Sequence, residues 1–164
     1  MKSMSNLFGQ DASGAIFSEC GKYRYVLWRV WDETKAKVMF IGLNPSTANA
    51  DKNDNTITKV IKVARNNGFG GMYMLNLFAI ISPYPEILTT NIDRQGENDA
   101  YLKKYFELSD AIVCCWGNFK EARKRANEVR IMTNRSLLCF TQNKNFTPKH
   151  PLYCKDDTKF IPFV

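Results

Sequence analysis

Four short apolar runs divide the chain, and each is followed by a polar or glycine-containing segment. They cover residues 38–41, 72–78, 110–116 and 136–140. Apolar runs of this length, rich in β-branched and aromatic residues, predict strands that are buried on both faces of a sheet. The first run ends at Gly-Leu-Asn-Pro, where the proline removes a backbone donor and turns the chain into a loop. We therefore expect these four runs to form the centre of the fold.

The segments between the runs show helical spacing. Apolar residues recur every three or four positions over residues 56–67, and again along a helix capped by Asn98 or Asp99. A strongly basic helix begins at Asn118 and continues to Arg130. Each predicted helix joins two of the predicted strands, and this alternation is typical of parallel sheets with helices on both faces.

Before the first run, residues 15–17 and 23–31 flank a glycine-containing turn, and the second of these segments has a period near 2. This predicts an antiparallel hairpin. The expected fold is a three-layer α/β/α domain over residues 15–164, with a central four-stranded, mainly parallel sheet and the N-terminal hairpin. The polar residues 1–14 are expected to form a loose arm.

Composition limits the class of protein. With 164 residues, 45% of them hydrophobic, the chain is long enough for one domain with a substantial core. It contains neither an apolar signal segment nor a stretch near the roughly 20 residues of a membrane span. We expect a cytoplasmic monomer without a membrane partner.

The net charge and the cysteines indicate which partners and cofactors to expect. The net charge of +7 favours polyanionic partners. Nucleic acid is the expected partner, with DNA favoured over RNA. The five cysteines have no Cys-x-x-Cys spacing, which indicates reduced, buried thiols. Nucleotide-binding glycine loops, hydrolase triads and metal clusters are absent from the sequence, so we expect neither a cofactor nor a metal.

Unusual polar residues follow the predicted strands. Asn44 follows the first strand, Asn76 lies in the second, Trp116-Gly117 ends the third, and His150 follows the last. Because ligands of open α/β sheets bind beyond the carboxyl ends of the strands, these residues are expected to meet at one site. Two amides and the single histidine are better suited to holding a heterocycle and a water than to nucleophilic attack.

Two resemblances support this expectation. The first, to the family called domain of unknown function 1643, covers nearly the whole chain from Tyr23. Its motifs are residues 42–48 (Gly-Leu-Asn-Pro-Ser-Thr-Ala), Asp54-Asn55-Thr56, Gly71, residues 76–79, residues 96–99, Trp116-Gly117 and residues 150–153. The same order of motifs is distantly similar to the uracil-DNA glycosylase superfamily, although Ser46 replaces the usual Gly or Tyr after the proline.

The second resemblance implies a glycosylase-like fold, hydrolysis of the N-glycosidic bond of a flipped base, and a role for each residue. The catalytic residues would be Asn44, which positions water, and His150, which stabilises charge on the leaving base. The base-binding residues would be Gly42, Leu43, Pro45 and Asn76, together with an aromatic residue that stacks on the base, for which Phe78, Tyr84 and Trp116 are all candidates. The DNA contacts would be Ser46, Thr47, Lys144, Lys149, Leu152 and Tyr153.

Other interpretations stay open at the level of sequence. Asn44 is also a common turn residue, His150 is also compatible with a structural position, and Trp116 with the core. A non-catalytic module that binds nucleic acid, nucleotide or protein is the first alternative function. A hydrolase of free nucleosides or nucleotides is the second.

Overall fold

A computed structural model describes residues 12–164. Residues 1–11, which make up most of the predicted arm, lie outside the described part of the chain, and residues 12–14 already belong to the first strand. The strands are β1 (Ala12–Phe17), β2 (Arg24–Val30), β3 (Lys37–Gly42), β4 (Gly71–Asn76), β5 (Ala111–Cys114), β6 (Leu138–Cys139) and β7 (Ile161–Pro162). The α-helices are α1 (Asn55–Asn66), α2 (Asn98–Leu108) and α3 (Arg123–Arg130).

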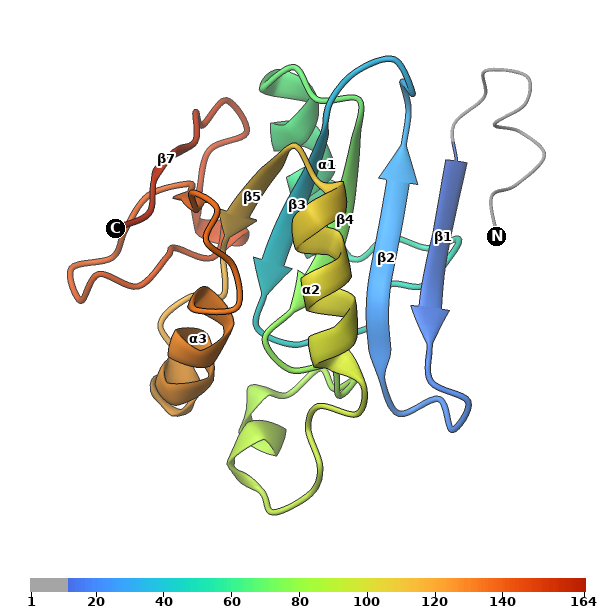
Figure 1. The fold of residues 1–164 in the computed structure, drawn as a ribbon, viewed down its shortest axis with the longest axis vertical. Coiled ribbons are helices and arrows are strands. Elements are labelled where there is room, and N and C mark those ends of the chain that lie inside the picture. The colour runs from blue at the N-terminus through green and yellow to red at the C-terminus, as the bar shows by residue number, and fades with distance from the viewer. Residues whose placement is uncertain (1–11) are drawn as a thin grey trace.

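One seven-stranded sheet runs through the molecule in the order β1-β2-β4-β3-β5-β6-β7 (Figure 1). The four central strands, β4, β3, β5 and β6, pair in parallel, as expected from the apolar runs. The predicted antiparallel hairpin of β1 and β2 is confirmed, and it extends the same sheet through an antiparallel pairing of β2 with β4. The sheet is therefore larger than the four strands expected, because the hairpin joins one edge and β7 the other.

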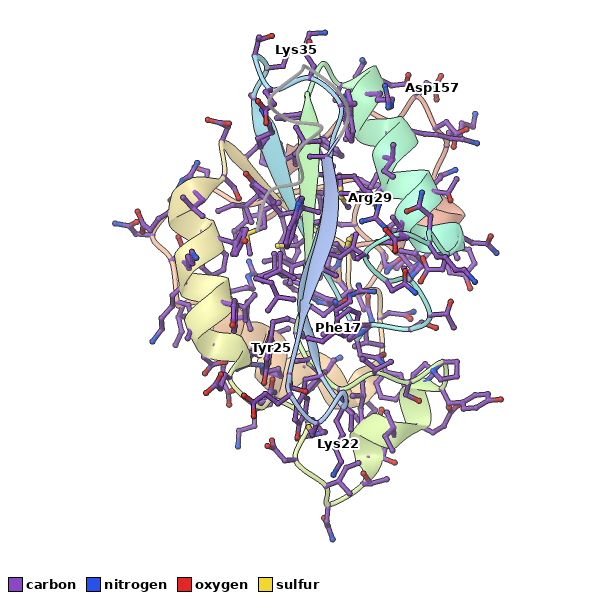
Figure 2. All side chains as sticks on the ribbon, turned by 90° about the vertical axis from the view of Figure 1, so that its right-hand side faces the viewer. Phe17, Lys22, Tyr25, Arg29, Lys35 and Asp157 are labelled. Carbon is purple, nitrogen blue, oxygen red and sulfur yellow. The ribbon has the colours of Figure 1, made fainter. Side chains whose placement is uncertain are left out.

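Helices cover both faces of the sheet. Figure 2 shows the sheet edge-on, with α1 on one side and α2 on the other. Alternate residues of β3 enter separate cores: Val38 and Phe40 pack with α1, whereas Met39 and Ile41 pack with α2 and α3. Side chains of a strand alternate between the faces of a sheet, so a continuous apolar run supplies two cores at once.

The three helices lie where they were predicted, but their caps and bounds differ in part from the prediction. Helix α1 lies where the spacing predicted it, and Asp54 is its N-cap, accepting from the Ile57 backbone N–H at 2.9 Å. Helix α2 has Glu97 at its N-cap; the Asn98 side chain instead donates to the backbone oxygens of Asn76 and Leu77. The expected basic helix at Asn118 splits into the short 3-10 helix η3 (Lys120–Ala122) and α3.

One arginine of the basic helix α3 points into the protein rather than toward solvent. Arg125 is buried, donates to the Leu77 backbone oxygen and pairs with Asp99 at 2.5 Å. Three cysteines (Cys114, Cys115, Cys139) are buried, as expected for reduced thiols, whereas Cys20 is exposed. Within residues 12–164 no helix is long and apolar enough to cross a membrane.

Candidate functional site

A cavity of about 200 Å³ lies at the carboxyl ends of β3 and β4, on the face that α1 covers. Half of the residues that line it are polar or charged, and we call it the polar cavity. Seven of the residues predicted for the site line it: Gly42, Leu43, Asn44, Pro45, Ser46, Asn76 and His150. They come from segments more than 100 positions apart, and the parallel strands bring them to one edge of the sheet. The structure therefore places the two amides and the histidine around one space.

Asn76 ends β4 with its side chain buried beside the cavity. The residue is 2% exposed, and its Nδ2 has no hydrogen-bond partner in the described part of the protein. Its Oδ1 lies so close to the chain of β3 that a Cβ at Gly42 would approach it to 2.7 Å. Gly42 therefore makes room for the amide. A buried amide without a partner costs free energy, so Asn76 Nδ2 is a donor available to a water or a ligand in the cavity.

His150 enters the cavity from the loop before the short 3-10 helix η4 (Pro151–Tyr153). Its Nδ1 accepts from the backbone N–H of Leu152 at 3.2 Å, so the proton of the neutral ring resides on Nε2. Burial lowers the pKa of His150 below its ordinary value, and the charge of Asp54 only partly opposes this shift. At neutral pH the ring is an uncharged donor through Nε2.

Asn44 is held by the neighbouring loop. Its Nδ2 donates to the backbone oxygens of Pro45 (3.1 Å), Ile80 (3.3 Å) and Ser82 (3.0 Å). These bonds fix the orientation of the amide. In the described part of the chain its Oδ1 receives no hydrogen bond from a protein group. This oxygen is thus available as an acceptor for a water or ligand.

Several cavity residues were not predicted, above all Arg24 and Asp54. Arg24 of β2 is 3% exposed, and its Nη1 donates to the Ala48 backbone oxygen at 3.0 Å. A signal for it exists in the sequence, because Arg24 is a charged residue at the start of an apolar strand. Asp54 was recognised only as part of the Asp54-Asn55-Thr56 motif, without a role in the site. Cys115 also lines the cavity, and burial raises the pKa of its thiol, which leaves it protonated.

Two residues predicted to bind the base lie elsewhere. Trp116 belongs to the core on the opposite face, where its ring packs edge-on against Phe163 at 5.7 Å. It lines a separate cavity of about 210 Å³ with residues of α3 and of the loop around Phe146. Phe78 is buried on that face too, under the guanidinium of Arg94 at 4.9 Å. Neither ring can stack on a ligand in the polar cavity.

Most of the predicted DNA contacts do not line the polar cavity. Of these residues only Ser46 lines the cavity. Leu152 and Tyr153 directly follow His150 and are exposed, Tyr153 to 78%. Lys144 is exposed and Lys149 partly so. Thr47 is exposed as well. No group of three or more potential metal ligands occurs within residues 12–164.

Unpartnered buried atoms distinguish the two cavities. Four buried side-chain atoms lack a partner in the described residues, and two of them, Arg24 Nε and Asn76 Nδ2, belong to residues that line the polar cavity. The residues around the Trp116 cavity contribute none. The polar cavity is therefore the one with unmet hydrogen-bonding capacity, as expected for a binding site.

Comparisons with known proteins identify the family. A family model described as "Protein of unknown function (DUF1643)" matches residues 24–152. Neither the curated proteins nor the solved structures gave a match. The matched segment begins at Arg24 and includes His150, so it encloses every residue that lines the polar cavity. The chain therefore belongs to the DUF1643 family.

Proposed function

We propose that the polar cavity binds a base flipped out of DNA and that the protein hydrolyses its N-glycosidic bond, as in the uracil-DNA glycosylase superfamily. The observation that carries this proposal is the meeting of Asn44, Asn76 and His150 around one cavity of about 200 Å³. That volume is below the roughly 300 Å³ at which pockets for drug-sized ligands begin, so it suits a small heterocycle.

Two N–H donors at the cavity can form hydrogen bonds with the acceptor atoms of a nucleobase. Asn76 Nδ2 is buried without a partner and can donate to a carbonyl oxygen on the ring. His150 can donate through Nε2, because its Nδ1 already accepts from Leu152. As the glycosidic bond breaks, negative charge develops on the base, and a fixed N–H donor lowers the energy of that charge.

The attacking water needs one group that holds it by accepting a hydrogen bond and a second group that takes its proton. Asn44 Oδ1 can hold the water, but an amide cannot take its proton. Asp54 is the carboxylate among residues 12–164 that lines the cavity, and within this part of the chain its carboxylate accepts one hydrogen bond, from the Ile57 N–H to Oδ1. In the proposed step the water oxygen bonds to C1′ of the sugar while the C1′–N bond breaks. The base leaves with the electron pair, and Asp54 accepts the proton of the water.

Exposed side chains beside the cavity favour nucleic acid over a free base. Tyr84 lies between Pro83 and Pro85, which line the cavity, and is 70% exposed. Leu152 and Tyr153 follow His150 on the other side and are exposed as well. Apolar and aromatic side chains beside a base pocket are suited to stacking on neighbouring bases or to filling the gap left by the flipped base.

A non-catalytic binding module is the second candidate. The three hydrogen bonds from Asn44 Nδ2 to backbone oxygens give this residue a structural task that does not require chemistry. In such a module the same cavity would recognise a base without cleaving its bond.

Base release tests the proposal. We expect chromatography to detect free base after incubation with single- or double-stranded oligonucleotides that contain uracil, mismatched or modified bases. Asn44→Ala is expected to reduce the rate about 100-fold, in the range typical of positioned acid–base groups. Asn127→Ala, in the Trp116 cavity, is the matched control and should keep the wild-type rate.

Three outcomes separate the candidate functions. Free base from oligonucleotides supports the glycosylase. Free base from nucleosides but not from oligonucleotides supports a nucleoside hydrolase. Salt-dependent binding of oligonucleotides by folded protein, without release of base from any substrate, would contradict hydrolysis and support the binding module.

A further inference from the structure

Two buried arginines on β2 differ in how many hydrogen bonds their side chains make. Arg29 is 8% exposed and donates to five oxygens: those of Gly14, Trp28, Asn49, Lys52 and the Asn53 side chain. Arg24 is 3% exposed, and within residues 12–164 its side chain makes one hydrogen bond, to the Ala48 backbone oxygen. Its Nε has no partner in the described part of the protein. The Arg29 side chain therefore has a structural role in joining neighbouring segments, whereas the Arg24 guanidinium retains N–H groups that can bind a ligand.

A β-bulge directs Arg24 into the cavity. Ile16 pairs with Val26 but Phe17 pairs with Arg24, so Tyr25 is an extra residue in β2. Tyr25 and Val26 consequently both enter the core on the α2 face, while Leu27 enters the core on the α1 face. Figure 2 shows Tyr25 and Arg29 on opposite sides of the sheet. Because of the bulge, the side chain of Arg24 lies on the same face of the sheet as those of Leu27 and Arg29, and the cavity is on this face.

The charge of Arg24 is not neutralised by a direct contact. Burial lowers the pKa of Arg24 to about 10, so the side chain stays cationic at neutral pH. No carboxylate among residues 12–164 forms an ion pair with it. The other charged residue that lines the cavity is Asp54, which is half-buried, and the N-terminus of α1 offsets part of its charge. Asp54 acts on Arg24 only at a distance: its charge partly opposes the lowering of the Arg24 pKa, but the two side chains form no ion pair. Buried charges are normally paired directly, so Arg24 retains the capacity to bind an anion.

We infer that Arg24 binds an anionic oxygen group of the ligand, either a carboxylate on the base or a phosphate of the attached nucleotide. A guanidinium presents parallel N–H donors that match both groups, and such charge-assisted bonds are stronger than neutral ones. The inference rests on the proposed function, because it takes the ligand to be a nucleobase with its sugar and phosphate. It adds that the cavity selects ligands by charge as well as by the shape of the ring.

Calorimetry with paired probes tests this inference. The first pair is uracil and 5-carboxyuracil, and the second is thymidine and thymidine 5′-monophosphate. In the wild-type chain we expect the anionic member of one pair to bind about tenfold or more tightly than its neutral partner. A preference within the first pair assigns the anion to the base, and a preference within the second assigns it to the phosphate.

Variants test whether the preference for the anionic probe depends on Arg24. Arg24→Gln should abolish this preference, and Arg24→Lys, which keeps the charge but lacks Nε, should reduce it. Lys62→Gln is the matched control, since Lys62 is exposed on α1 and its loss changes the net charge equally. It should keep the preference. Equal binding of neutral and anionic probes, a preference that survives in Arg24→Gln, or no binding of any anionic probe would overturn the inference.

The readout is binding, so its result is independent of hydrolysis. If no base is released from any oligonucleotide but the charge preference follows Arg24, the hydrolytic function fails and the anion site stands. If base is released at equal rates from neutral and anionic substrates, with equal binding, the anion site fails and the hydrolytic function stands.

Discussion

Replacing His150 by asparagine is expected to slow base release about 100- to 1,000-fold, which is the usual cost of removing one fixed donor from developing negative charge. An asparagine oxygen can occupy the position of Nδ1 and continue to accept from the Leu152 N–H, which His150 contacts at 3.2 Å. The variant therefore keeps the loop while it loses the Nε2–H. The rate is measured as free base formed from the best oligonucleotide substrate.

His150→Gln is the complementary variant. A glutamine amide can place a donor near the position of Nε2 but loses the acceptor for Leu152. We expect it to retain more activity than His150→Asn and to be the less stable of the two. The reverse order of activities, or wild-type activity in both variants, would show that the Nε2–H has no part in catalysis.

The pH dependence of stability follows from the same residue. The pKa of His150 is lowered in the folded state, so the unfolded chain binds a proton more readily. His150 therefore contributes stability above its ordinary pKa of 6.5, and this contribution is lost as pH falls through that value toward the lowered one. Thermal unfolding between pH 8 and about pH 5 should show this loss in the wild type. His150→Asn should not show it.

Asn76→Leu is expected to weaken base binding about 10- to 100-fold and to raise the free energy of unfolding of the empty protein by about 1 kcal/mol. The wild-type amide is buried with an unpartnered Nδ2, so the empty protein bears its desolvation cost. Leucine has a similar size and removes that cost together with the donor. Calorimetric binding and denaturant unfolding measure the two effects.

Asn98→Leu is the matched comparison for stability. Asn98 is also fully buried, but its Nδ2 donates to the Asn76 and Leu77 backbone oxygens at 2.9 and 3.3 Å. Its replacement removes one donor from each of those oxygens, although the Leu77 oxygen still accepts from Arg125, and should lower the free energy of unfolding by about 1 to 3 kcal/mol. A large loss of stability in Asn76→Leu as well would mean that Asn76 serves the fold rather than a ligand.

The centre of the fold was predictable because its signals are local. The apolar runs of β3, β4 and β5 are long enough to identify buried strands, and the spacing of Ile57, Val60 and Ala64 identifies α1. The apolar run at residues 136–140 likewise predicted β6, although the strand itself covers only Leu138–Cys139. Strand β7 has two residues and carries no pattern of its own, so its position depends on tertiary contacts.

The cavity was predictable in part. Residues at the ends of parallel strands meet, which is why Asn44, Asn76 and His150 could be grouped. Trp116 was grouped with them, but the structure places it away from the polar cavity because consecutive residues point to opposite faces: Cys115 lines the polar cavity and Trp116 the other one. Arg24 was missed because its orientation depends on the bulge at Tyr25, and pairing of β2 with β1 is what reveals that bulge.

Nitrogen-15 NMR during titration with the released base tests the central claim most directly, namely that the polar cavity is the nucleobase site. We predict that the Asn76 side-chain amide and the His150 ring nitrogens shift on binding, while the indole N–H of Trp116, in the other cavity, stays unchanged. Shifts at Trp116 with none at Asn76 and His150, or no shifts at either cavity, would contradict this claim.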